Sequence, residues 1–116
     1  EHAALVQRVL GAYQQITVRA HAHGLHVIGA TITPYVGSGY YHPGPLSEAD
    51  RQAVNKWTRT PGHFDAVADF DSVVRDPQHP DQLLPAYDCG DHLHPSPPGY
   101  KAMGDAIPLS FFEEAK

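Results

Sequence analysis

The sequence predicts a single α/β domain in which helices cover a parallel sheet. Apolar residues recur at helical spacing in three segments, and two short apolar, β-branched runs separate those segments. The order helix, strand, helix, strand, helix implies βαβ connections, which place consecutive strands side by side and parallel. The length of 116 residues is typical of one domain, so we assign residues 1–116 to it.

The first helix is expected over residues 3–23. Its apolar stripe repeats every three to four residues and comprises Leu5, Val6, Val9, Leu10, Tyr13 and Ile16. Gly24 follows, and glycine suits the left-handed backbone conformation that often ends a helix. The run HVIGATIT at 26–33 then predicts a strand. Because its apolar residues do not alternate strictly, we expect this strand to be covered on both faces.

The middle of the chain predicts a loop, a second helix and a second strand. Residues 34–45 are rich in glycine and proline and predict the loop. Ser47 is expected to cap the helix, whose buried side comprises Ala49, Ala53, Val54 and Trp57. TPGH at 60–63 ends that helix, and FDAVADF at 64–70 predicts the second core strand. The polar run at 75–82 is expected to be an exposed loop.

The last helix is expected to start at Ser96 and Pro97. The serine hydroxyl can accept a hydrogen bond from a free backbone N–H group, and proline fits the first helical position. The residues expected to face inward are Tyr100, Met103, Ala106 and Ile107. Pro108 interrupts the helix, and three residues are expected to close the core: Leu109, Phe111 and Phe112.

Two strands do not complete a sheet, because both edges remain unpaired. A further piece of chain, a second copy or an unrecognised strand must therefore cover those edges. The sequence opens at Glu1 without an initiator methionine and enters a helical pattern within a few residues. We therefore expect a fragment or a processed piece of a longer protein.

Composition narrows the classes of partner. The net charge is −5, and the eight basic residues are scattered, which argues against nucleic-acid binding. No apolar run approaches the roughly 20 residues needed to cross a bilayer, and no signal peptide is recognisable. The single cysteine, Cys89, excludes an internal disulfide framework and a thiolate zinc cluster. It is either a free thiol or half of a bridge to something outside this chain.

The segment DCGDHLHPSPPGY, residues 88–100, carries the strongest chemical signal. Asp91 and His94 stand three residues apart, so a tight turn brings the carboxylate to one ring nitrogen while the other stays free. Such a pair is the base half of a Ser-His-Asp arrangement. Two alternatives remain open. One is an ordinary polar loop, and the other is a metal site whose ligands are Asp88, Asp91, His92 and His94.

The wider segment resembles the last conserved block of the SGNH (GDSL) hydrolase family. That block has Asp-x-x-His-Pro before a helix that opens with Gly-Tyr, and the matching residues here are Asp91, His94, Pro95, Gly99, Tyr100 and Met103. VIGATITPY and FDAVADFDSVVRDP resemble two preceding stretches of the family, so the resemblance covers nearly the whole chain. It implies the C-terminal part of a flavodoxin-like, three-layer parallel sheet with flanking helices. The N-terminal part of that fold is absent from this sequence.

The resemblance implies a serine ester hydrolase of the carboxylesterase, lipase or acetylesterase kind, with His94 as general base and Asp91 as its orienting partner. No cofactor or metal is implied, and the implied partner is a small-molecule ester. His92 matches no functional position of the family. Many relatives are exported, but this sequence carries no address, so the compartment stays open.

The nucleophile and the oxyanion donors that the family uses do not occur here. Gly-Asp-Ser is missing, and the only asparagine, Asn55, lies on an expected helix. Ser38, in GSGYY beyond a strand, is the best local serine, but its surroundings are not a nucleophile elbow. The alternatives to the esterase are a non-catalytic fragment that self-associates through its strand edges and a small metal-binding protein.

Overall fold

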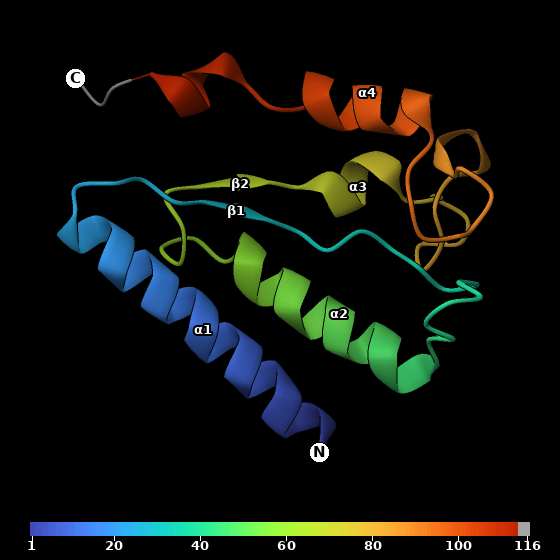
Figure 1. The fold of residues 1–116 in the computed structure, drawn as a ribbon, viewed down its shortest axis with the longest axis horizontal. Coiled ribbons are helices and arrows are strands. Elements are labelled where there is room, and N and C mark those ends of the chain that lie inside the picture. Colours follow the sequence, from blue (N-terminus) through green and yellow to red (C-terminus); the bar gives the residue numbers. More distant parts are fainter. Residues whose placement is uncertain (114–116) are drawn as a thin grey trace.

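The structure is a computed structural model that describes residues 1–113, and it confirms an α/β chain. Helix α1 (His2–Ala22) is followed by β1 (Ile28–Ala30), α2 (Pro45–Arg59) and β2 (Ala66–Ala68). The remaining elements are α3 (Phe70–Val74), α4 (Pro97–Asp105) and the 3-10 helices η1 (Pro85–Tyr87) and η2 (Leu109–Phe112). In Figure 1 the two strands run between the α1–α2 pair and α4.

The two strands form the predicted βαβ unit. They pair in parallel, with Ile28 opposite Ala66 and Ala30 opposite Ala68, and α2 connects them. Both strands are shorter than the sequence predicts. Beyond β1, the backbone of Ile32 bonds to a side chain of α2 instead of a strand, and beyond β2, Asp69 caps α3. Two strands do not define the order of a flavodoxin-like sheet.

Helix α1 has the predicted bounds to within one residue, but it buries a narrower face. Val6 and Leu10 pack with Val54 of α2, whereas Leu5 and Ile16 are exposed, contrary to expectation. Helix α1 lies against α2, so only the side that faces this neighbour is covered. The helix ends as predicted: Gly24 has a φ of 70°, and Leu25 N–H donates to the carbonyl of Ala20.

Helix α2 differs from the prediction at its start and on its buried side. It begins at Pro45 with Gly44 as N-cap, so Ser47 lies inside the first turn and does not cap the helix. Proline at this position needs no N–H partner and has a suitable φ, which explains the earlier start. Ala49 and Ala53 are exposed, and the buried residues of α2 are Arg51, Val54, Asn55 and Thr58.

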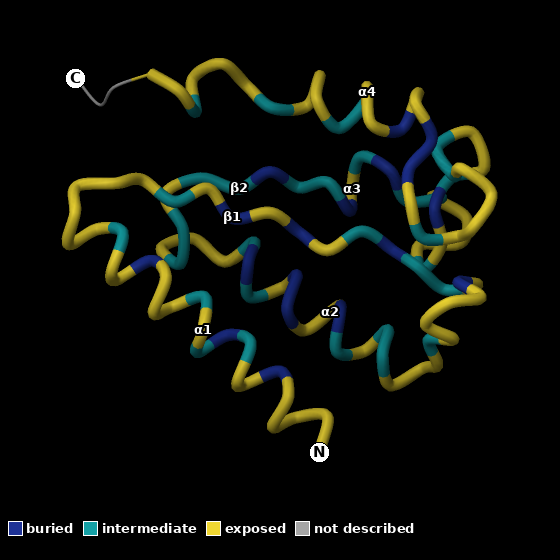
Figure 2. The backbone as a smooth tube through the Cα atoms, in the orientation of Figure 1, coloured by how far each residue is buried: buried dark blue, intermediate teal, exposed yellow. Residues whose placement is uncertain are grey.

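The interior of the described residues is unusually polar. Besides the prolines Pro34 and Pro95, its buried apolar residues are Val6, Leu10, Val54, Ala68, Val74 and Leu83. The buried polar or charged ones are Thr17, Thr31, Ser38, Arg51, Asn55, Thr58, Asp71 and Ser96. Figure 2 shows that buried positions of α2 and α3 lie beside the strands. Hydrogen bonds and ion pairs therefore hold this part of the fold together alongside hydrophobic packing.

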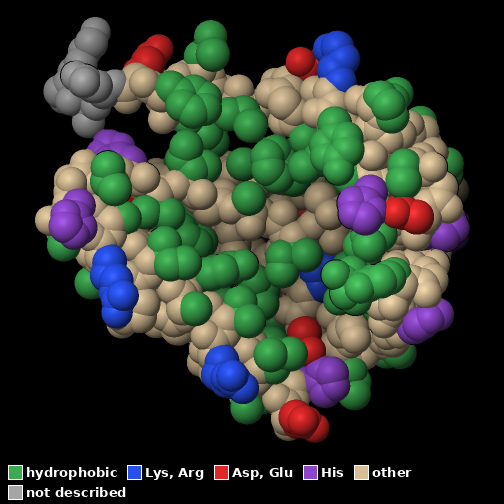
Figure 3. All heavy atoms as spheres, viewed as in Figure 1, with side chains coloured by type: hydrophobic (Ala, Val, Ile, Leu, Met, Phe, Trp, Pro, Cys, Tyr) green, Lys and Arg blue, Asp and Glu red, His purple; other side chains and the backbone are tan. Residues whose placement is uncertain are grey.

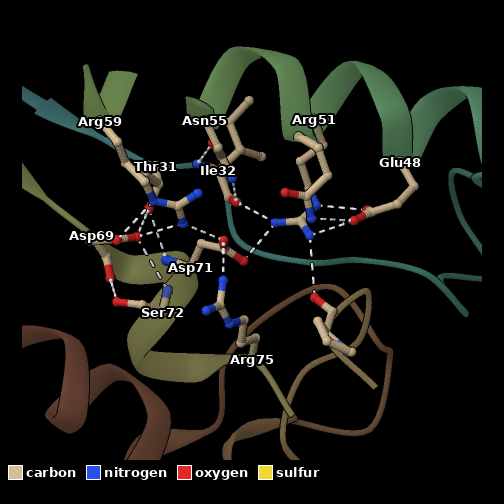
Figure 4. Close-up of polar contacts among 12 residues, drawn as sticks. Thr31, Ile32, Glu48, Arg51, Asn55, Arg59, Asp69, Asp71, Ser72 and Arg75 are labelled. Atoms are coloured by element: carbon tan, nitrogen blue, oxygen red, sulfur yellow. Dashed lines mark hydrogen bonds and ion pairs between the residues drawn. The ribbon is translucent and has the colours of Figure 1, made fainter. Parts of the chain in front are cut away.

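Asp71 is the centre of the polar interior (Figure 4). Its fully buried carboxylate accepts hydrogen bonds from three guanidinium groups: Arg51 at 2.7 Å, Arg59 at 2.5 Å and Arg75 at 3.2 Å. Its backbone N–H donates to the hydroxyl of Thr31, just beyond β1. Helices α2 and α3 and the end of β1 are therefore joined through one residue.

Two further contacts fix the same region. The Asn55 amide accepts from the backbone N–H of Ile32 at 2.7 Å and donates to its carbonyl at 2.8 Å, as a neighbouring strand would.

Burial favours the protonated form of Asp69, but hydrogen bonds from Arg59, Thr31 and Ser72 outweigh it and lower the pKa of Asp69 from 3.8 to about 2. Its stabilising contribution is complete above pH 3.8 and is lost as the pH falls toward about 2.

Helix α4 packs on α3 and η1, and its predicted inward face is only partly covered: Met103 and Ile107 are half-buried. Tyr100 and Ala106 are exposed, and so are Leu109, at 81%, and Phe112. These side chains have too little sheet to cover them. In Figure 3 hydrophobic side chains accordingly gather on the viewed face over the strands and beside α4. The radius of gyration of 15.2 Å exceeds the roughly 13 Å of a compact domain of this length.

We expect Asp71→Asn to lower the free energy of unfolding by about 3–5 kcal/mol, because it leaves three guanidinium groups without their shared charged partner. Asp105→Asn is the matched control, since it removes an exposed pair with Lys101 and should cost about 0.5 kcal/mol or less. Urea denaturation followed by circular dichroism measures both. Equal effects of the two substitutions would contradict the central role of Asp71.

Candidate active site

The loop at residues 88–95 is closed at its base by backbone hydrogen bonds. Cys89 N–H donates to the carbonyl of His94 at 3.1 Å, and Ser96 N–H donates to the carbonyl of Tyr87 at 2.7 Å. Asp88 and Pro95 face each other in an antiparallel bridge. The loop therefore has a defined shape although it contains no helix or strand of its own.

Helix α4 starts where the sequence predicts and holds the loop from its far end. Ser96 accepts from the N–H of Gly99 at 3.3 Å and donates to the carbonyl of Ala86 at 2.8 Å. Gly99 lies so close to the chain before the loop that a Cβ at this position would stand 2.7 Å from the carbonyl oxygen of Tyr87. The close approach requires glycine and brings both ends of the loop together.

Asp91 and His94 meet within this loop. The Nδ1 atom of His94 lies 2.6 Å from Oδ2 of Asp91, while Oδ1 accepts from the backbone N–H groups of Leu93, at 2.9 Å, and His94, at 2.8 Å. A carboxylate only accepts, so Nδ1 carries the hydrogen and Nε2 is left for another partner. The hydrogen bond from the His94 ring is the main reason why the pKa of Asp91 lies well below its usual range. Asp91 is therefore ionised at neutral pH, and the His94 side chain is 62% exposed.

A second aspartate–histidine pair lies beside the first. The Nδ1 atom of His92 lies 2.6 Å from Oδ2 of Asp88, whose Oδ1 accepts from the N–H groups of Gly90, at 2.8 Å, and His92, at 3.1 Å. Sequence reasoning considered these two residues only as metal ligands and missed their pairing. The available signal was the Gly90 between them, which has a φ of 112° and lets the chain turn back on Asp88.

An open cleft of about 540 Å³ separates the loop from the segment that follows β1. Its two walls comprise Gly37, Ser38, Gly39 and Tyr40 on one side and Gly90, Asp91, His92 and Leu93 on the other. The segment after β1 and the Asp-His loop, distant in sequence, thus face each other beyond the carboxyl ends of the strands, where open α/β sheets bind ligands.

A comparison with protein families identifies the chain. Residues 2–102 match the GDSL-like Lipase/Acylhydrolase family. The chain belongs to this family. The resemblance seen in the sequence is therefore confirmed, and at the family level the chemistry is hydrolysis of ester bonds. A comparison with curated proteins finds no match. Among the described residues, no helix is both long and apolar enough to span a membrane.

The local serine that the GDSL-like chain offers is badly placed for nucleophilic attack. Ser38 is only 2% exposed, and its hydroxyl accepts from the backbone N–H groups of Tyr40 and Tyr41, both at 3.3 Å. These contacts make Ser38 part of a turn. The Asn55 amide is also engaged, because both of its polar atoms bond to Ile32. The Ser38 hydroxyl and the Asn55 amide are thus both engaged in holding the backbone.

The metal alternative finds limited support in the geometry. Ligand atoms of Asp88, Cys89 and Asp91 lie within 4.8 Å of one another. Both carboxylates, however, already bond to a histidine ring and to backbone N–H groups, so a metal ion would have to displace those contacts. Cys89 is exposed and is a free cysteine.

We expect the Asp91 carboxyl of the intact chain to titrate well below its ordinary range in carboxyl-detected NMR. His94→Ala should raise the pKa of Asp91 because the ring supplies the strongest hydrogen bond, although the backbone N–H of Leu93 still lowers it. His92→Ala is the control and should leave the pKa of Asp91 unchanged, since His92 pairs with Asp88. A larger effect of His92→Ala would show that the pairs are exchanged.

We expect Gly99→Ala to destabilise the chain by about 1–3 kcal/mol, because the new methyl group collides with the Tyr87 carbonyl. Gly104→Ala lies in the same helix with open space around it, and it should be neutral or stabilising by up to about 1 kcal/mol. Chemical denaturation measures both variants. A destabilising Gly104→Ala would show that helix α4 itself, and not its contact with the loop, is sensitive to substitution.

Proposed function

We propose that this chain supplies the acid–base half of a serine ester hydrolase, with His94 as general base and Asp91 as its orienting partner. The supporting observation is the 2.6 Å contact between the His94 ring and the Asp91 carboxylate in a member of a lipase and acylhydrolase family. The Asp-x-x-His-Pro sequence at 91–95 matches the family block from which these roles are transferred.

The pair can perform both proton transfers of ester hydrolysis. The Nε2 atom of His94 takes the proton of a serine hydroxyl as that oxygen attacks the ester carbon, and it then gives the proton to the departing alcohol. Asp91 fixes the tautomer that leaves Nε2 free, and its negative charge stabilises the imidazolium formed between the two steps. A water molecule, activated by the same base, releases the acid from the serine.

The nucleophile and the oxyanion donors are proposed to come from residues outside this sequence. We propose that they belong to an N-terminal part of a flavodoxin-like sheet, which would also cover the strand edges. Exposed apolar side chains on several elements support this arrangement, including Leu5 of α1, Ile28 of β1 and Tyr100 of α4. The proposed substrate is a small ester of the carboxylesterase, lipase or acetylesterase type, and the mechanism needs no cofactor.

The rival function is self-association of a non-catalytic fragment. The open strand edges and the exposed Leu109 and Phe112 favour it, because a second copy could cover them. Light scattering coupled to size-exclusion chromatography tests the rival: a stable dimer supports self-association, and a monomer over the whole concentration range contradicts it. Phosphonate label on a serine of this chain would also contradict a non-catalytic fragment.

We expect His94→Gln to reduce hydrolysis of short-chain p-nitrophenyl esters by about 10²–10⁴-fold, because no other group removes the serine proton. His79→Gln is the matched control, as His79 also pairs with an aspartate, Asp76, but in an exposed loop away from the cleft. The assay is made on a longer gene product that carries a Gly-Asp-Ser block, because the chain alone is proposed to lack the nucleophile. Equal rates for wild type and His94→Gln would exclude His94 from the mechanism.

A further inference from the structure

We propose that His92, held by Asp88, is a substrate-binding residue that accepts a hydrogen bond from a hydroxyl group on the alcohol part of the ester. The inference rests on the proposed ester-hydrolase function and adds the substrate class: esters of sugars or similar polyols. It concerns the second aspartate–histidine pair, which the acid–base mechanism does not use.

The ring of His92 is fixed with one nitrogen available. Asp88 is nearly buried, and both of its oxygens are occupied, one by the ring and the other by two backbone N–H groups. Because the carboxylate accepts from Nδ1, the neutral ring presents the lone pair of Nε2. Within residues 1–113, Nε2 of His92 makes no hydrogen bond. A fixed acceptor of this kind suits a hydroxyl donor.

The backbone at His92 supports a role beyond that of a plain turn. Its φ is 58°, a left-handed conformation that is uncommon for a residue other than glycine. The facing wall approaches the ring closely, because a Cβ at Gly37 would lie 3.3 Å from Cγ of His92. The glycine at 37, with a φ of 99°, therefore lets the turn after β1 pack against the ring. Both walls hold His92 at the cleft.

The rest of the cleft matches a hydroxylated ring. Tyr40 is 80% exposed and lies on the wall opposite His92, with its ring supported edge-on by Tyr41 at a centroid distance of 4.8 Å. An exposed aromatic face packs against the C–H face of a sugar ring, while the histidine accepts from a hydroxyl at the edge of that ring. Asp91 lines the cleft together with His92, and its carboxylate bonds to the His94 ring, so the cleft adjoins the proposed acid–base pair.

The proposal is tested by binding, which does not depend on turnover. Histidine ring nitrogens are recorded by long-range ¹H–¹⁵N NMR while the intact chain is titrated with methyl β-xylopyranoside, and tetrahydropyran serves as the ring without hydroxyl groups. We expect a saturable shift of the His92 Nε2 resonance with the glycoside only. His92→Phe removes the acceptor nitrogen, and Asp88→Asn frees the His92 ring from its carboxylate. Either substitution should weaken glycoside binding about fivefold. His79→Gln should leave it unchanged.

The outcomes separate this proposal from the proposed function. No shift at His92, or equal shifts with the glycoside and with tetrahydropyran, overturns the role of His92, whatever the esterase assay gives. If His92→Phe perturbs the backbone amide spectrum beyond residues 88–95, the Asp88→Asn titration decides instead. Glycoside binding at His92 together with an unaffected esterase rate in His94→Gln supports the sugar site and removes the acid–base role of His94.

Discussion

The fold depends on the buried carboxylate of Asp71. A single side chain receives guanidinium groups from two turns of α2 and from the residue that ends α3, and its backbone reaches the end of β1 through Thr31. A charge in this position is tolerated because every oxygen has a charged donor. If any of these elements moved away, buried charged side chains would lose their partners. The ion pairs around Asp71 therefore hold the carboxyl ends of both strands as one unit. The loop at residues 88–95 is built outward from that unit.

The connection from this unit to the loop is short. Leu84 N–H donates to the carbonyl of Val74, so the chain that leaves α3 returns beside it before entering η1. Helix α4 then packs on α3 and η1. The Asp91–His94 pair is thus positioned by backbone contacts that lead back to α3 and not by the sheet itself. This arrangement explains how an exposed loop keeps an ordered site while much of the apolar surface around α4 stays uncovered.

The sequence predicted the features that depend only on residues close together in the chain. Ser96 and Pro97 start a helix, Gly24 ends one, and the spacing of Asp91 and His94 allows their contact. Other features have distant causes. The end of β1 depends on Asn55, which replaces a neighbouring strand at Ile32, and the end of β2 depends on Asp69, which caps α3. Helical periodicity predicts buried faces on α1 and α4, but parts of those faces stay exposed because the sheet is too small to cover them. The Asp88–His92 pair depends on a loop conformation that the sequence periodicity of helices and strands does not predict.

Cys89 gives the loop a chemical handle. It is the single thiol of the chain, it is exposed, and its own N–H closes the loop by bonding to the carbonyl of His94. An electrophile that alkylates this sulfur attaches its bulk where the loop closes, within 4.8 Å of a carboxylate oxygen of Asp91. A reagent specific for one surface thiol would therefore place a label next to the carboxylate that bonds to the His94 ring.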